Sequence, residues 1–235
     1  MHEDDGQPHP GLVAGAIAHP AMRSRMASRL PLPRLYAILD QQRTGGRLIE
    51  DICQELLRAG LRLFQYRHKR GSSREMLETV SRLLPMIRRE SGLLMVNDRA
   101  DVALVAGADG VHLGQEDLPA ERARGILRPG QLVGQSTHNL GQLRRSDASS
   151  ADYVAFGPVF ATTGKDAPDP TVGLHGLDEA RRATSKPLVA IGGITAQNAR
   201  QVIAHGADSV AVMSGLLGAG DLSARAQEFL NALQE

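Results

Sequence analysis

Several residue types are scarce in this chain of 235 residues, and each scarcity excludes a class of protein. The single cysteine, Cys53, cannot form an intramolecular disulfide, and it falls on the apolar side of a predicted helix as a small core residue. Tryptophan is absent and aromatic residues make up 3%, so nucleobases would find few stacking platforms. The net charge of +1 provides no basic field for nucleic acid. No apolar run reaches the ~20 residues of a membrane span, so we expect a cytoplasmic protein that binds neither nucleic acid nor membrane.

The first 33 residues differ in pattern from the rest of the chain. Residues 1–33 mix histidine, glycine, proline and alanine without a sustained period. The acidic residues 3–5 argue against a signal or transit peptide. We predict a disordered extension or an upstream translation start, with Met22 and Met26 as alternative starts. Residues 34–235 have a length that suits one α/β domain.

From Arg34 onward, short apolar runs alternate with segments of helical period. The expected strands are 35–39, 61–69, 93–97, 110–113, 132–136, 153–156, 188–191 and 209–213. The expected helices are 48–57, 73–89, 101–106, 119–127, 140–147, 177–184, 196–205 and a last one capped by Asp221. Apolar strands are typical of parallel sheets that are buried on both faces. No Gly-x-Gly-x-x-Gly follows the first strand, which disfavours a Rossmann sheet. The eight strand–helix pairs therefore predict a single α/β domain of the (β/α)8, or TIM barrel, type.

One turn sequence occurs twice in this pattern. Ala106-Gly-Ala-Asp109 precedes the strand at 110–113, and His205-Gly-Ala-Asp208 precedes the strand at 209–213. We expect the same helix-to-strand turn at both places.

Two acidic residues follow successive predicted strands. Asp98 comes directly after 93–97, and Asp117 follows 110–113. In a parallel barrel the carboxyl ends of the strands converge on one mouth. With Asn97 and Gln115 beside them, these oxygen ligands suit Mg²⁺, which keeps several waters and binds substrate phosphate. Capping of the next helix is the alternative role for Asp98.

Polar residues also alternate at the end of the strand 61–69. Gln65, Arg67 and Lys69 share one side of the strand, and an inward orientation would place an amide and two cations in the mouth. Solvated strand-end charge is the alternative. Tyr66 and His68 should point the other way and have structural roles.

The strand at 132–136 ends with Ser136, two residues before His138. A serine–histidine nucleophile pair is disfavoured because neighbours in sequence seldom reach the required geometry and no orienting acid is evident. We expect Ser136 to donate a hydrogen bond to substrate, and His112 to be a satisfied core histidine.

The remaining strand ends carry features of anion sites. The loop 157–175 contains Thr162, Thr163 and Lys165, which offer hydroxyls and a cation in what we expect to be a lid or binding loop. Gly192-Gly193 and Met213-Ser214-Gly215 follow the last two strands, where this fold usually binds phosphate.

Together these motifs resemble the thiamine-phosphate synthase (thiamine-phosphate pyrophosphorylase) family from about Arg34 to the C-terminus. The stretches that carry the resemblance are Gln65-Tyr-Arg-His-Lys69, Asn97-Asp98, His112-Leu-Gly-Gln-Glu-Asp117, Gly134-Gln-Ser136, Gly157-Pro158 through Lys165, Ile191-Gly-Gly-Ile194 and Val212-Met213-Ser214. The resemblance implies a transferase with Mg²⁺ as cofactor. It would couple 4-amino-2-methyl-5-hydroxymethylpyrimidine diphosphate with 4-methyl-5-(2-phosphooxyethyl)thiazole, giving thiamine phosphate and diphosphate.

The resemblance also implies roles for individual residues. Asp98 and Asp117 would bind Mg²⁺. The pyrimidine diphosphate would be held by Gln65, Tyr66, Arg67, His68, Lys69, Asn97, Ser136 and Lys165, of which Arg67, Lys69, Ser136 and Lys165 would act in catalysis. The thiazole phosphate would be bound by Thr162, Thr163, Gly164, Gly193, Met213 and Ser214. Gly164 departs from the family pattern Thr-x-Thr/Ser-Lys, and losing that hydroxyl should cost about 0.5–1.5 kcal/mol of binding free energy.

Two other functions stay open. A thiazole tautomerase of related sequence would use His138 as its acid and base, and a non-catalytic sensor would bind the phosphorylated small molecules without turnover. A homo-oligomer is also possible.

Overall fold

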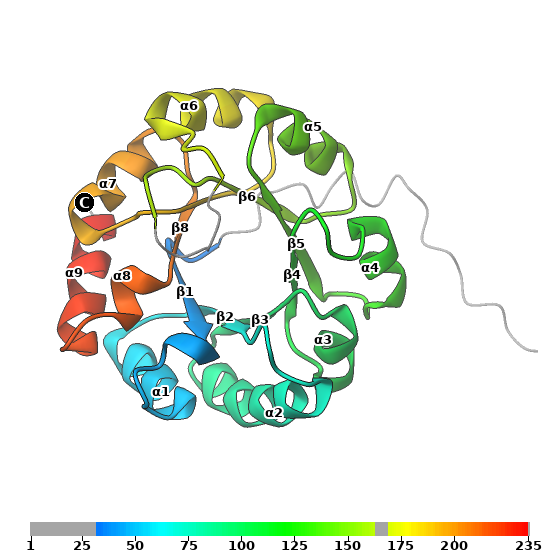
Figure 1. Cartoon of the computed structure of the whole chain (residues 1–235), viewed down its shortest axis with the longest axis vertical. Coiled ribbons are helices and arrows are strands. Elements are labelled where there is room, and N and C mark those ends of the chain that lie inside the picture. Colours follow the sequence, from blue (N-terminus) through cyan, green and yellow to red (C-terminus); the bar gives the residue numbers. More distant parts are fainter. Residues whose placement is uncertain (1–31, 163–168, 235) are drawn as a thin grey trace, which may run out of the picture. The chain divides into compact units, whose positions relative to one another are not determined.

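The computed structural model describes residues 32–162 and 169–234. Within these residues, eight parallel strands close into a barrel, each paired with the next and the last with the first (Figure 1). Their bounds are β1 Leu35–Asp40, β2 Leu63–Arg67, β3 Leu93–Asn97, β4 Gly110–Leu113, β5 Leu132–Thr137, β6 Tyr153–Phe156, β7 Leu188–Ile191 and β8 Ser209–Val212. The structure confirms the predicted TIM barrel. The predicted extension at 1–33 falls almost wholly outside the described residues.

Helices surround the barrel and connect successive strands (Figure 1). Their bounds are α1 Ile49–Ala59, α2 Ser73–Arg89, α3 Ala100–Ala106, α4 Ala120–Ile126, α5 Leu140–Ala148, α6 Gly173–Ala183, α7 Ala196–Ala204, α8 Ser214–Leu217 and α9 Leu222–Gln234. The short helices η2 (Gln41–Arg43) and α8 were not expected. α6 begins four residues before the predicted 177, because Val172 and Gly173 donate backbone hydrogen bonds to Pro158 and Val159 and turn the chain early.

Capping contacts mark the ends of three helices. Gly60 ends α1 in the left-handed conformation, with φ of 106°, and its N–H reaches the carbonyls of the last turn. Ser72 and Glu75 form a capping box at the start of α2. Asp221 accepts a hydrogen bond of 2.9 Å from the Ala224 N–H at the start of α9.

The hydrophobic core lies between the outer face of the barrel and the helices. Outward-facing strand residues such as Phe64 and Val111 pack there against α-helical side chains such as Leu83. Cys53 is fully buried in this layer, and burial raises the pKa of its thiol to about 12, with a smaller contribution from Glu50. Its predicted role as a small core residue is therefore confirmed.

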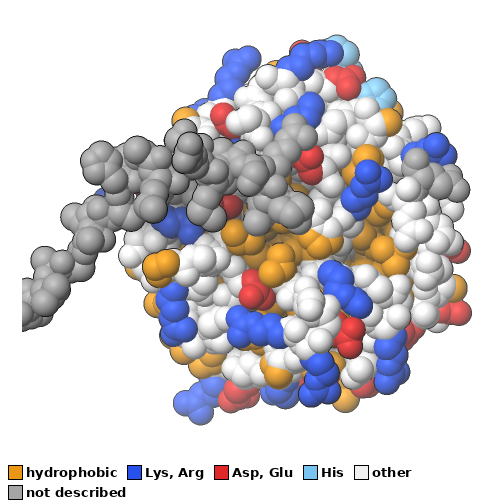
Figure 2. All heavy atoms as spheres, turned by 180° about the vertical axis from the view of Figure 1, so that it is seen from behind, with side chains coloured by type: hydrophobic (Ala, Val, Ile, Leu, Met, Phe, Trp, Pro, Cys, Tyr) orange, Lys and Arg blue, Asp and Glu red, His pale blue; other side chains and the backbone are white. Residues whose placement is uncertain are grey.

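The surface of the described residues carries mixed charge. On the face shown in Figure 2, Lys and Arg side chains alternate with Asp and Glu around a central group of hydrophobic atoms. None of the described helices is long and apolar enough to cross a membrane.

The repeated turn sequence forms an aspartate clamp at the amino ends of the strands. Each clamp is built around an aspartate that lies just before a strand. Its carboxylate accepts a hydrogen bond from a backbone N–H near the start of the previous strand in the sequence, and it forms an ion pair with an arginine. The clamps are Asp109 with Leu94 N (2.8 Å) and Arg88, Asp152 with Val133 N (2.7 Å) and Arg124, and Asp208 with Leu188 N (2.8 Å) and Arg181. The clamps of Asp109 and Asp208 use the two copies of the repeated turn sequence.

These contacts predict that Asp208→Ala destabilises the barrel. The substitution leaves the buried Leu188 N–H without its acceptor, which should lower the free energy of unfolding by about 1–3 kcal/mol. Asp208→Asn keeps an oxygen acceptor, so its free energy of unfolding should fall by less than that of Asp208→Ala. Urea denaturation of both variants tests this, and equal stability of Asp208→Ala and the unmodified chain would contradict it.

Candidate active site

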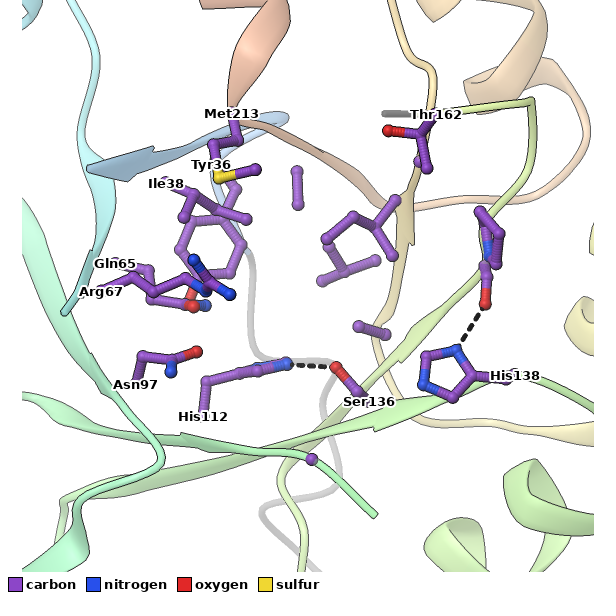
Figure 3. A pocket seen from close by; sticks show the side chains of 18 of the residues that line it. Tyr36, Ile38, Gln65, Arg67, Asn97, His112, Ser136, His138, Thr162 and Met213 are labelled. Carbon is purple, nitrogen blue, oxygen red and sulfur yellow. Dashed lines mark hydrogen bonds between the residues drawn. The ribbon is translucent and has the colours of Figure 1, made fainter. Parts of the chain in front are cut away.

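A cavity of about 740 Å³ opens at the carboxyl ends of the strands. Residues of all eight strands line it, including Tyr36, Gln65, Asn97, His112 and Ser136 (Figure 3). Its volume lies in the range of small-molecule sites.

Most residues predicted for the site line this cavity. They are Gln65, Arg67, Lys69, Asn97, Asp98, Asp117, Ser136, Thr162, Gly193, Met213 and Ser214. Thr163, Gly164 and Lys165 lie outside the described residues. The alternation along β2 therefore places Gln65, Arg67 and Lys69 inward, as predicted.

Tyr66 and His68 are not part of the cavity lining. Tyr66 is fully buried in the core outside the barrel, where its hydroxyl donates to Gln41 Oε1 at 3.3 Å and lies 3.4 Å from His68 Nδ1. The structural role predicted from the alternation fits this placement. The substrate contact that the family resemblance implied for these two side chains has no counterpart in the cavity lining.

The two predicted metal ligands come together at the ends of β3 and β4. Asp98 forms an ion pair with Lys69, and Asp117 Oδ2 accepts a hydrogen bond of 2.6 Å from the Gly114 N–H. Burial raises the pKa of the Asp117 carboxyl, and the adjacent Asp98 raises it further. Asp98 adopts a left-handed backbone conformation with φ of 63°, and it is not the cap of α3, which begins after Arg99.

This acidic pair fits a divalent cation that needs few protein ligands. Two carboxylates held side by side repel each other, and a cation between them would relieve that repulsion. No group of three or more His, Cys, Asp or Glu side chains with metal-site geometry occurs among the described residues. Mg²⁺ suits such a site because it retains waters and takes substrate oxygens.

Arg67 is held by a residue that the sequence analysis missed. Its guanidinium pairs with Asp40 at the end of β1, and Asp40 is completely buried. Asp40 Oδ1 also accepts the Gln42 N–H at 2.8 Å. The ion pair fixes the direction of the Arg67 side chain, and the visible signal was an aspartate that ends an apolar strand.

His112 lies on the cavity floor between two hydroxyl groups. Its Nδ1 is 2.9 Å from the Tyr153 hydroxyl. Its Nε2 is 2.9 Å from Ser136 Oγ (Figure 3). Burial lowers the pKa of His112 to about 4, a shift that Asp117 partly offsets, so the imidazole is neutral at pH 7. The prediction of a satisfied histidine is thus confirmed, although it also lines the cavity.

His138 does not contact Ser136 as a catalytic base would. Its Nδ1 is 2.7 Å from the Gly157 carbonyl oxygen and 3.5 Å from Asp169 Oδ2 (Figure 3). Ser136 instead has His112 as its partner. A nucleophile pair between neighbours, already disfavoured by the sequence, is therefore not formed.

Glycines shape the cavity beside β7. Gly192 and Gly193 have φ of 100° and 63°, which glycine adopts without strain. A Cβ atom at Gly193 would lie 2.5 Å from the Ala161 carbonyl oxygen. Only glycine therefore lets this turn pack against Phe160 and Ala161. Met213 and Ser214 line the cavity beside it, at the start of α8.

Comparisons with known proteins agree with this site. The family model for thiamine monophosphate synthase matches residues 35–216. The chain is 50% identical over 212 residues to a thiamine-phosphate synthase of Koribacter versatilis, covering 88% of this chain and 99% of that protein. It is 46% identical to a thiamine-phosphate synthase of Methanoculleus marisnigri, covering 82% and 92% of the two chains.

Solved structures give the same result. A thiamine phosphate pyrophosphorylase from Pyrococcus furiosus is 35% identical and superimposes with a TM-score of 0.78, covering 86% of this chain and 95% of that one. With the match of the family model over most of the barrel, these similarities show that the chain belongs to the thiamine monophosphate synthase family, whose members are transferases of thiamine biosynthesis.

Proposed function

We propose that this cavity couples 4-amino-2-methyl-5-hydroxymethylpyrimidine diphosphate to 4-methyl-5-(2-phosphooxyethyl)thiazole, releasing diphosphate and forming thiamine phosphate. The observation that carries the proposal is the arrangement of one cavity with two ends whose side chains and backbone suit anions. Carboxylates and cations from β2, β3 and β4 gather at one end, and glycine turns after β7 and the start of α8 form the other.

The diphosphate belongs at the charged end. Arg67, fixed by Asp40, and Lys69, paired with Asp98, hold positive charge where the leaving group would depart. Mg²⁺ between Asp98 and Asp117 would supply further positive charge to the diphosphate oxygens. The resemblance assigns Lys165 to this group, and Asn97 lines the same part of the cavity.

The thiazole phosphate belongs at the glycine end. Gly193 and Ser214 leave room for a phosphate close to the backbone, and Thr162 offers a hydroxyl from the facing segment. With the two substrates at opposite ends, the thiazole nitrogen would face the pyrimidine carbon from which diphosphate leaves.

The chain would contribute charge and positioning rather than covalent catalysis. Ser136 is hydrogen-bonded to a neutral His112 on the floor, and His138 Nδ1 is engaged by the Gly157 carbonyl. The resemblance implies dissociative displacement, in which departure of diphosphate leaves a pyrimidine cation. Such a reaction needs electrostatic stabilisation of the leaving group and exclusion of water, and no protein nucleophile.

The direct test is incubation with both substrates and Mg²⁺. We expect thiamine phosphate and diphosphate in equal amounts, detected by chromatography. Isomerisation of the thiazole without coupling would instead indicate a tautomerase that uses His138. Binding of both compounds without any product would indicate a sensor.

The acidic pair provides a second prediction. Asp98→Asn or Asp117→Asn should lower kcat/KM by ~100-fold or more and raise the Mg²⁺ concentration needed for half-maximal activity. Both residues lie at strand ends outside the core, so the variants should stay folded. Glu121→Gln, on the outer surface of α4, is the matched control with unchanged activity. Turnover like that of the unmodified chain at limiting Mg²⁺ would reject the metal assignment.

The glycine end provides a third prediction. Gly193→Ala should raise the KM for thiazole phosphate about tenfold, equivalent to about 1.4 kcal/mol of binding free energy, because the new Cβ would displace the segment at Ala161. The KM for the pyrimidine diphosphate should change much less. Gly125→Ala in α4, where a Cβ meets nothing within 4 Å, is the control. Equal increases in the KM values of both substrates would contradict the placement of the thiazole phosphate at the glycine end.

A further inference from the structure

Five polar side chains from five strands form one continuous hydrogen-bonded relay across the barrel interior. Gln65 Nε2 donates to the Tyr36 hydroxyl at 3.0 Å, and the Tyr36 and Tyr153 hydroxyls are 3.1 Å apart. Tyr153 continues to His112 Nδ1, and His112 Nε2 continues to Ser136 Oγ, both at 2.9 Å. The two ends, Gln65 and Ser136, line the cavity, whereas Tyr153 lies beneath it.

The contacts of the relay can all point in one direction, because each hydroxyl and the imidazole has a single hydrogen to donate. A phenol hydroxyl carries one hydrogen, and a neutral imidazole carries one N–H. Gln65 Nε2 donates to the Tyr36 hydroxyl. In the arrangement that continues this direction, Tyr36 donates to Tyr153 and Tyr153 donates to His112 Nδ1. The imidazole hydrogen then lies on Nε2 and is donated to Ser136 Oγ.

This direction determines what the two ends present to the cavity. Gln65 uses its amide nitrogen for Tyr36, so its Oε1 is left as an acceptor. Ser136 accepts from His112, so its hydroxyl hydrogen is left as a donor. Reversing the whole relay requires the amide of Gln65 to turn over and every hydrogen along the relay to move.

The packing around the relay leaves room for it and holds it in place. Gln65, Tyr36, Tyr153 and His112 are each less than one-tenth exposed. The Tyr36 and Tyr153 rings meet edge to face with centroids 6.4 Å apart. A Cβ atom at Gly134 would lie 2.1 Å from the Tyr153 ring and 2.6 Å from His112 Nδ1, so only glycine at this position leaves space for that contact.

We propose that Tyr36, Tyr153 and His112 are positioning residues, which act as one unit to fix Gln65 as an acceptor and Ser136 as a donor toward the heteroaromatic ring of the substrate. The proposal rests on the proposed function, in which that ring is an aminopyrimidine. An exocyclic amino group donates a hydrogen bond and a ring nitrogen accepts one, which matches this pair. In the corresponding oxo compound the substituent accepts and the adjacent ring nitrogen carries hydrogen, which opposes it. The relay is therefore a specificity determinant for amino over oxo pyrimidines.

The test measures binding rather than turnover, using the aminopyrimidine diphosphate and the same diphosphate with an oxo group in place of the amino group. Isothermal titration in Mg²⁺ gives a Kd for each ligand with the unmodified chain, Tyr36→Phe, Tyr153→Phe and the double variant. We expect the unmodified chain to bind the amino compound at least about tenfold more tightly than the oxo compound. Each single variant should weaken binding of the amino compound about tenfold and bring the ratio of the two Kd values close to one.

The double variant shows whether the relay acts as one unit or whether Tyr36 and Tyr153 contribute to binding independently. If the relay acts as one unit, the double variant should bind no more weakly than either single variant, because one break already frees both ends. Thr137 does not line the cavity, and its buried hydroxyl donates to the Ala155 carbonyl. Thr137→Val removes this hydroxyl and should keep the amino-to-oxo ratio of the unmodified chain. Thermal denaturation of all variants checks that they are folded.

Two results would overturn the proposal. One is an unchanged amino-to-oxo ratio in folded Tyr36→Phe and Tyr153→Phe, and the other is additive losses in the double variant. Failure of the proposed coupling reaction would appear separately, as absence of thiamine phosphate in the turnover assay, while the binding ratios would still report on the relay.

Discussion

The closure of eight parallel strands is the constraint on which the rest of this structure depends. Because all strands run in one direction, every carboxyl end arrives at the same mouth, and residues from β2, β4, β5 and β8 become neighbours. The acidic pair, the cations and the glycine turns are each unremarkable strand-end features. Closure makes them parts of one cavity.

Alternation along each strand then divides the residues between the cavity and the core. On β2, Gln65 and Arg67 point inward while Phe64 and Tyr66 pack against helices, so neighbours in sequence have unrelated tasks. The inward layer cannot be filled with large side chains alone. Gly134 shows this, since its missing side chain is the space in which Tyr153 meets His112. A polar floor is thus built from Gln65, Tyr36, Tyr153 and His112, which are buried, and from Ser136, which is partly buried, each hydrogen-bonded to the next.

Much of this could be predicted from the sequence, and the exceptions have a common cause. Apolar runs and helical periods gave the barrel, and Asp98 and Asp117 were placed together because their strands are consecutive. The pairing of Asp40 with Arg67 and the relay from Gln65 to Ser136 were missed. Both depend on the register between strands and on rotamers, which one sequence does not encode in a readable pattern. Helix α8 was missed because four residues carry too little periodicity.

The aspartate clamps at the opposite end of the barrel have an architectural consequence. Each clamp ties an even-numbered strand to the odd-numbered strand before it, joining β3 with β4, β5 with β6, and β7 with β8. The clamps thereby group β3 to β8 into three paired modules, each with the helix that precedes its first strand, because that helix carries the arginine of the clamp. The boundary between two modules, such as the loop between β4 and α4, is crossed by no clamp of this type in the described residues. A chain divided at such a boundary would keep all three clamps intact within its two fragments.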